Sequence, residues 1–180
     1  MGGFGMAERL DLYNQYRQHL KGKTIERGNK LDEGTFHLVA HVCIFNQKGE
    51  MLIQQRKFNK KLWPGLWDFS AAGAVMKGET SNIAAQREIK EELDLDFDLT
   101  KMRPQLSMTF PFGFDDVYLI QAEVQLNDIH IEKGEVEDIR FAGREEILSL
   151  IENEKFINYK PGLIELIFDF VESGNDGMYQ

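Results

Sequence analysis

The chain has 180 residues, of which 42% are apolar and 13 are phenylalanine, so it can form one domain with a sizeable core. Its formal net charge of −9 argues against non-specific binding of a nucleic-acid polymer. The single cysteine, Cys43, excludes an internal disulfide, and no apolar run reaches the about 18 residues of a transmembrane helix. We therefore expect a cytoplasmic protein that does not act in a membrane.

The first 34 residues are polar and contain several glycines, which indicates a small N-terminal extension over residues 1–34. Leu10, Leu12 and Tyr13 precede a turn, and residues 23–26 can form a second strand, which predicts a β-hairpin. Residues 1–13 lack the basic and apolar regions of a signal peptide, and residues 1–5 are expected to be a leader outside the fold or an addition that is not native.

Residues 37–45, HLVAHVCIF, are apolar on both faces of a strand, which predicts a central strand covered by helices on both sides. A turn at 46–49 and an apolar run at 51–55 predict that this strand is followed by a returning one. A basic segment then leads into Trp63-Pro64-Gly65, which is a strong turn signal, and residues 68–75 are expected to be extended.

A helix is predicted from residue 81 to about residue 93, with Thr80 or Ser81 as its N-cap. At about 100° per residue, its apolar side chains form one stripe. Glu88, Glu91 and Glu92 lie within about 100° of one another on a neighbouring face. The helix is therefore amphipathic, with three carboxylates close together.

The rest of the chain continues the alternation of strands and helices up to a polar tail at residues 174–180. The predicted elements are strands at 106–110 and 117–124 across a loop at 111–116, a strand at 135–141, a helix at 144–152, and a helix from Pro161 to Val171.

Three carboxylates on adjacent helical turns repel one another, and a bound divalent cation removes that repulsion. Oxygen ligands suit Mg²⁺ or Mn²⁺, whereas the sequence offers no set of Cys and His ligands for zinc. Arg87 can orient Glu79 through a bidentate pair. The alternative is a solvated helix face on which Arg87 pairs with Glu91 four residues later.

The spacing from Gly73 to Leu95 resembles the Nudix box of the Nudix (MutT-like) family, G-x5-E-x7-R-E-U-x-E-E-x-G-U, in which U is aliphatic. The eight positions that match, of nine specified, are Gly73, Glu79, Arg87, Glu88, Ile89, Glu91, Glu92 and Leu95. The family's second glycine is Asp94 here, and we expect Asp94 to adopt the left-handed conformation after the helix.

This resemblance implies an α/β (α+β) fold, an α/β/α sandwich around a mixed sheet, over residues 35–173. It also implies Mg²⁺ or Mn²⁺ bound by Glu88, Glu91 and Glu92, with help from the carbonyl of Gly73. Many members use a glutamate outside the box as general base, and Glu135 is the candidate for that role. An exposed acid at the edge of a strand is the alternative for Glu135.

Residues 52–79 resemble a branch that contains isopentenyl-diphosphate isomerase and similar hydrolases. The isomerase has a catalytic Cys and a metal-binding His in an S-x-C-G-H-P segment, where this chain has Ala72 and Ala74. Cys43 belongs to another strand and is expected to be a buried apolar residue. We therefore expect hydrolysis of a diphosphate bond in a nucleoside-diphosphate-linked or similar small molecule. An isomerase-like enzyme or a non-catalytic ligand sensor are the alternatives.

The dense basic segment before the box is a candidate for contact with substrate phosphates, through Arg56, Lys60 and Lys61. A solvated loop is the alternative. Phe112 and Phe114 in the predicted loop can contact a base or a prenyl-like group, or pack into the core.

His37 and His41 form a His-x3-His pair, a pattern that can indicate a metal site. On one strand they would lie about 13 Å apart, which is too far for one ion.

Dimerisation is common in the resembled family, so a homodimer is an open alternative.

Overall fold

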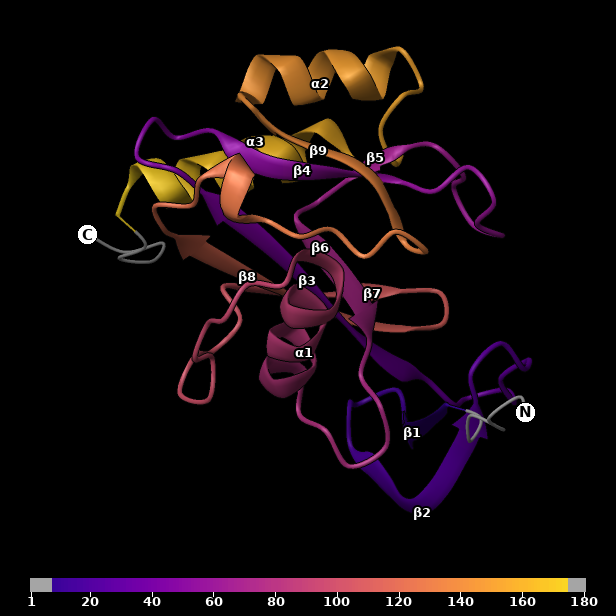
Figure 1. Cartoon of the computed structure of the whole chain (residues 1–180). Helices are drawn as coiled ribbons and strands as arrows, with labels where there is room; N and C mark the ends of the chain where they lie inside the picture. The colour runs from indigo at the N-terminus through magenta and orange to yellow at the C-terminus, as the bar shows by residue number, and fades with distance from the viewer. Residues whose placement is uncertain (1–7, 175–180) are drawn as a thin grey trace.

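The computed structural model describes residues 8–174, so the predicted leader and residues 175–180 of the predicted tail lie outside the described residues. The elements are arranged in layers around a central sheet (Figure 1). They are β1 (Arg9–Tyr13), β2 (His19–Glu26), β3 (His37–Phe45), β4 (Met51–Arg56), β5 (Trp67–Asp68), β6 (Ala71–Ala74), α1 (Ser81–Leu93), β7 (Leu106–Phe110), β8 (Gly113–Gln121), the 3₁₀ turn η1 (Leu126–Asp128), β9 (Val136–Ala142), α2 (Arg144–Glu152) and α3 (Pro161–Glu172).

The central sheet is mixed, as predicted, and has the order β5-β4-β3-β8-β7, with β6 paired to β3 and β9 paired to β4. β3 and β8 are parallel along their full length, and the other pairs are antiparallel. β3 and β4 share only two residue pairs before they separate. Where they separate, the buried Ser70 hydroxyl accepts from Ile44 N (2.8 Å) and donates to Leu52 O (2.5 Å), so it satisfies one backbone group of each strand.

Helices cover both faces of this sheet because β3 is apolar on both faces. Its even-numbered residues, such as Ala40 and Val42, pack in a cluster with Ile89 of α1. Its odd-numbered residues Cys43 and Phe45 pack in the other cluster, with α2 and α3. The predicted α/β/α sandwich and the burial of Cys43 are confirmed. None of the helices described is long and apolar enough to span a bilayer.

The predicted helix over the box residues is confirmed as α1. Thr80 occupies the N-cap position, but its hydroxyl donates to the Asn82 side chain (2.6 Å) instead of accepting from the helix backbone. Asp94 ends the helix with φ 55° and ψ 29°, which is the left-handed conformation expected from the sequence.

The prediction of a loop at 111–116 was wrong, because β8 begins at Gly113 and ends at Gln121 rather than at residue 124. Only Pro111 and Phe112 remain outside the strands. Phe112 is exposed, whereas Phe114 is buried and packs against Phe36 (5.8 Å between ring centroids), so Phe114 is not available to a ligand.

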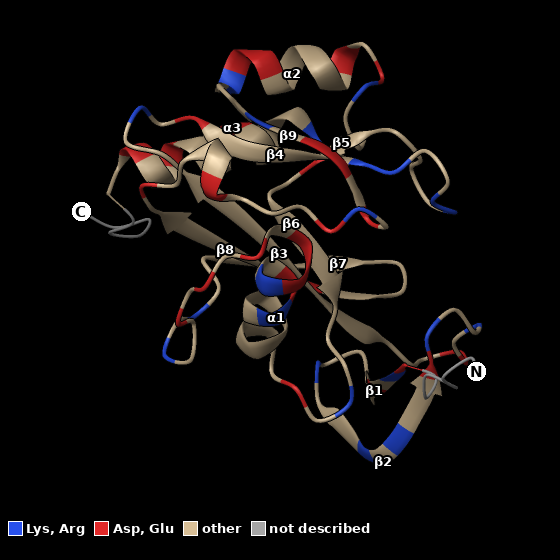
Figure 2. Cartoon of the chain, in the orientation of Figure 1, with Lys and Arg blue, Asp and Glu red and all other residues tan. Residues whose placement is uncertain are grey.

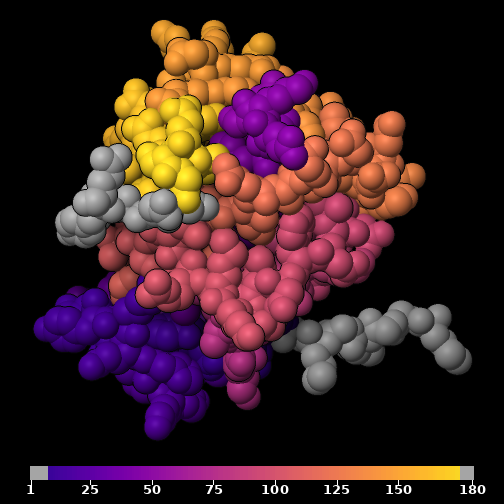
Figure 3. Space-filling view, turned by 90° about the vertical axis from the view of Figure 1, so that its left-hand side faces the viewer, coloured from indigo at the N-terminus to yellow at the C-terminus, as the bar shows by residue number. Residues whose placement is uncertain are grey.

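The predicted N-terminal hairpin is present as the separate sheet β1–β2, in which β2 is longer than expected. The space-filling view shows the hairpin, in indigo, at the opposite end of the molecule from the C-terminal helices (Figure 3). The end of the molecule with the hairpin is also the end at which α1 begins (Figure 1).

Candidate active site

The acidic residues of α1 divide into a buried pair and an exposed one. Glu88 and Glu92, one helical turn apart, are each only 7% exposed, whereas the Glu91 side chain is 59% exposed. All three lie in the C-terminal two turns of α1, where acidic and basic residues lie next to each other (Figure 2). The helix therefore presents two desolvated carboxylates toward the sheet.

The Glu88 carboxylate lies directly against the backbone of Gly73 in β6. A Cβ atom at position 73 would overlap the Glu88 carboxyl group, so any other residue there would displace Glu88. The first glycine of the box is thus required because a side chain would have no space there. Its backbone conformation does not require glycine, since its φ lies outside the left-handed range.

Glu92 is held by two neutral donors from the sheet. Its Oε2 accepts from Gln54 Nε2 of β4 (2.9 Å) and from Ala72 N of β6 (3.2 Å). Burial, together with the nearby charge of Glu88, raises the pKa of Glu92 to about 8. Burial also raises the pKa of Glu88, an effect that the neighbouring Arg87 opposes.

Arg87 and Glu79 form the bidentate pair that the sequence predicted. Arg87 Nε donates to Glu79 Oε1 (2.8 Å) and Nη2 donates to Oε2 (3.0 Å). Nη2 also donates to Ala74 O (3.0 Å), and Glu79 Oε2 accepts from Met76 N (2.9 Å). This network connects α1 to β6 and to the segment 75–80 between them, which we call the box loop.

The alternative pairing of Arg87 exists as well. Its Nη1 donates to Glu88 Oε1 (2.6 Å) and to Glu91 Oε2 (3.1 Å). With the side chains in this arrangement, no three Asp, Glu, His or Cys residues within 8–174 are placed to enclose a cation. The donor chemistry nevertheless fits Mg²⁺ or Mn²⁺, because Glu88 and Glu92 are buried oxygen ligands with raised pKa values, and Glu92 forms no ion pair among residues 8–174.

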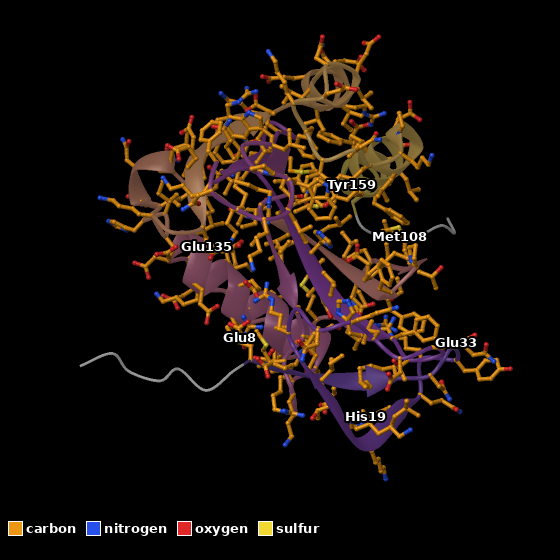
Figure 4. The ribbon with its side chains drawn as sticks, turned by 90° about the vertical axis from the view of Figure 1, so that its right-hand side faces the viewer. Glu8, His19, Glu33, Met108, Glu135 and Tyr159 are labelled. Atoms are coloured by element: carbon orange, nitrogen blue, oxygen red, sulfur yellow. The ribbon has the colours of Figure 1, made fainter. Side chains whose placement is uncertain are left out.

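Glu135, the predicted general base, lies near the C-terminal end of α1 (Figure 4). The segment before β9 is attached there, because Glu132 N donates to Glu92 O (3.0 Å). The Glu135 side chain is half exposed and pairs with Lys60. The structure thus brings together the predicted base and one of the predicted phosphate ligands.

The other two predicted phosphate ligands have different surroundings. The Arg56 Nε donates to Leu62 O (3.2 Å), and its guanidinium lies 3.7 Å from the buried Asp68. Lys61 is exposed and forms none of the ion pairs found among residues 8–174. Of the three basic side chains, Lys61 is the one whose charge is free for a ligand.

A buried polar cluster that the sequence did not predict lies on the face of the sheet that α3 covers. His41 Nδ1 lies 2.7 Å from Asp115 Oδ1, and Tyr159 Oη lies 3.2 Å from His41 Nε2. Tyr159 also donates to Asp68 Oδ1 (2.9 Å). Burial alone would lower the pKa of His41, but the Asp115 carboxylate raises it to about 9. The single signal in the sequence was a histidine inside an apolar strand, and its partners are remote along the chain.

The two histidines of β3 have different surroundings. His37 packs edge-on against Phe110, with 5.5 Å between ring centroids, and its buried Nδ1 has no hydrogen-bond partner among the residues that the structure describes. His41 belongs to the buried polar cluster instead.

Comparisons with known proteins agree with this geometry. A family model described as the NUDIX domain matches residues 35–162. A protein of Listeria monocytogenes named as an uncharacterized Nudix hydrolase is 50% identical over 152 residues, which are 84% of this chain and 89% of that protein. The isopentenyl-diphosphate Delta-isomerase of Citrobacter koseri is 29% identical over 120 residues, which are 64% of this chain and 66% of that enzyme.

The solved structures give the same result. A crystal structure of a Deinococcus radiodurans protein superimposes with a TM-score of 0.72 and 27% identity, and the match covers 89% of this chain and 97% of that one. The matched domain, the extent of the Listeria relative and the box geometry agree, and the chain therefore belongs to the Nudix hydrolase family.

Proposed function

We propose that this protein is a Mg²⁺- or Mn²⁺-dependent hydrolase that cleaves the diphosphate bond of a nucleoside-diphosphate-linked or similar small molecule. The observation that carries the proposal is the buried pair Glu88 and Glu92. Glu92 is held only by neutral donors and forms no ion pair within the described residues. Such a desolvated charge is unfavourable in the metal-free protein and suits a site that takes up a cation.

The ligands of the cation would be Glu88 and Glu92, joined by Glu91 and the Gly73 carbonyl. When bound there, the cation would neutralise charge on the diphosphate and lower the pKa of an attacking water. Gln54 and the Ala72 amide orient Glu92, and Arg87, fixed by Glu79, orients Glu88. The groups that hold Glu92 come from β4 and β6, whereas Arg87 of α1 is held by Glu79 of the box loop.

The proton of the attacking water needs an acceptor, and we assign that role to Glu135. Its half-exposed carboxylate is close to the end of α1 and is within reach of solvent (Figure 4). Lys60 positions this carboxylate by pairing with it. Lys61 and Arg56 then remain as the proposed contacts of the substrate phosphates.

Hydrolysis is favoured over isomerisation by the residues around Gly73. Ala72 and Ala74 provide neither a thiol nor an imidazole. Cys43 cannot replace the thiol, because it is fully buried in the cluster on the α2–α3 face of the sheet, and burial raises the pKa of its thiol. The buried carboxylates also argue against a sensor, since a ligand sensor has no need of a metal site.

The test is turnover of a panel of nucleoside diphosphate derivatives and of isopentenyl diphosphate, with Mg²⁺, with Mn²⁺ and with a chelator. Glu92→Gln should abolish metal-dependent release of phosphate or nucleotide. The matched control is Glu165→Gln, the same chemical change at an exposed position of α3, which should retain activity. Isomerisation of isopentenyl diphosphate without hydrolysis of any substrate would contradict the proposal. Tight binding of a ligand without turnover would favour the sensor.

A further inference from the structure

The N-terminal hairpin lies outside the residues that match the family model, yet its first strand contacts the box loop. Arg9 O accepts from Lys77 N (2.8 Å), and Leu10 forms an isolated antiparallel bridge with Met76. Figure 1 shows the loop between β6 and α1 extending down to β1. The backbone of the box loop is therefore paired with the hairpin.

The next residue of the hairpin, Asp11, adds a side-chain contact at the turn of the box loop. Asp11 is 9% exposed, and its Oδ2 accepts from Gly78 N (2.7 Å). Its Oδ1 lies 3.4 Å from His19 Nε2 of the same hairpin. Gly78 has φ 82°, a conformation that favours glycine, and the amide of this turn is bound by the carboxylate. A hydrogen bond to a buried carboxylate is stronger than one between neutral groups.

The contact between Asp11 and Gly78 is connected to α1 through Glu79 and Arg87. Gly78 is followed by Glu79, whose carboxylate is occupied by Met76 N and by the Arg87 guanidinium. Arg87 in turn donates to Glu88. Gly78 is thus connected to the Arg87–Glu88 pair through its neighbour Glu79.

A second contact of the hairpin reaches the first residue of α1. Arg17, in the turn between β1 and β2, pairs with the fully buried Asp116 of β8. Asp116 Oδ2 also accepts from Ser81 Oγ (2.5 Å), and its Oδ1 accepts from Ser107 Oγ (2.5 Å). The hairpin therefore contacts the box loop directly, through Asp11, and the first residue of α1 indirectly, through Arg17 and Asp116.

We propose that Asp11 is a positioning residue of the active site: by binding the Gly78 amide it orders the box loop and fixes the Glu79–Arg87 pair that orients Glu88. The active-site scaffold of this protein then includes its N-terminal hairpin, beyond the matched domain. The effect on turnover rests on the proposed function, whereas the effect on the box loop does not.

The first experiment is hydrogen–deuterium exchange of residues 76–80 in the full chain, without metal or substrate. Asp11→Ala should accelerate exchange of the Gly78 amide about tenfold, because a buried charge-assisted hydrogen bond is lost. Asp11→Asn keeps an acceptor oxygen and should restore most of the protection. Two variants serve as controls. His19→Gln changes the partner of Asp11, and Glu8→Gln removes an exposed ion pair with Arg27. Neither should change the exchange rate of the Gly78 amide.

The second readout is kinetic, with any substrate that the wild type hydrolyses. Asp11→Ala should lower kcat about tenfold, leave KM within about twofold and raise the Mg²⁺ concentration needed for half-maximal rate, because Glu88 is displaced and the substrate contacts are not. Asp11→Asn should recover most of kcat.

The inference is overturned if Gly78 exchanges at the wild-type rate in Asp11→Ala, or if Glu8→Gln accelerates it equally. If Asp11→Ala also accelerates exchange of the β2 amides, the comparison within that variant decides: the role requires a larger acceleration at Gly78 than in β2, and equal acceleration of both would again reject it. A wild type without diphosphatase activity would refute the proposed function alone, because the exchange experiment needs no substrate.

Discussion

Replacing Glu92 by Gln should stabilise the metal-free protein at alkaline pH while abolishing turnover. The substitution keeps an oxygen that can accept from Gln54 Nε2 and from Ala72 N, so the hydrogen bonds to Glu92 have a replacement. It removes the negative charge of Glu92, a residue that is only 7% exposed and lies close to Glu88. The variant thus separates the cost of the buried charge from the packing of the side chain.

The magnitude follows from the pKa of Glu92, which burial and Glu88 raise from an ordinary 4.5 to about 8. A raised pKa means that the folded state binds the proton more tightly than the unfolded state. The wild type therefore loses stability as pH rises from about 4.5 to about 8. At 1.36 kcal/mol per pKa unit the full difference is about 5 kcal/mol, and about 2–5 kcal/mol is expected because Glu88 shares the effect.

The assay is urea denaturation of chelator-treated protein at pH 5 and at pH 9. Glu92→Gln should match the wild type within about 1 kcal/mol at pH 5 and exceed it by about 2–5 kcal/mol at pH 9. Glu91→Gln is the control, since its exposed charge should change stability by less than about 0.5 kcal/mol at either pH. A difference between Glu92→Gln and wild type that does not depend on pH would refute the desolvation argument.

Three further predictions concern other parts of the molecule. Tyr159→Phe should cost about 1–3 kcal/mol of unfolding free energy in urea, because Asp68 loses a buried donor; an unchanged midpoint would contradict this. Asp94→Gly should raise the thermal midpoint by the equivalent of about 0.5 kcal/mol, since glycine removes the cost of the left-handed conformation at the loss of exposed ion pairs; a lower midpoint would show that the pairs dominate. Lys61→Ala should raise KM about threefold to tenfold with kcat retained, and more than Lys60→Ala does, because Lys60 is already paired; equal KM values for both variants and wild type would reject the phosphate contact.

Features that depend on local periodicity could be predicted from the sequence. The strand at 37–45, the helix at 81–93 and the pair Arg87–Glu79 all follow from residues that are at most about ten positions apart. The left-handed Asp94 could be predicted too, because a helix end has few available conformations. In each case the determining contacts lie within one element and its neighbour.

Contacts between remote segments could not be predicted in this way. Asp115 and Asp116 look like loop residues, but both lie inside β8, where His41 and Arg17, far earlier in the chain, are their partners. The pairing of Glu135 with Lys60 likewise joins residues 75 positions apart. A polar residue is expected to be exposed only when no hydrogen-bonding partner is available to it inside the protein. Which remote residues become its partners is determined by the sheet topology.

The buried pair Glu88 and Glu92 also connects metal uptake with stability. A cation that binds the folded state alone stabilises it by RT ln(1 + [L]/Kd), which is about 2.7 kcal/mol at a hundredfold excess over Kd. That is of the same order as the cost that burial imposes on Glu92 above pH 8. The metal-free protein should therefore gain stability from Mg²⁺ at pH 9 and lose that gain in Glu92→Gln. A protein that only sensed a ligand would have no reason to keep this cost, whereas a metal-dependent hydrolase recovers it when the cation binds.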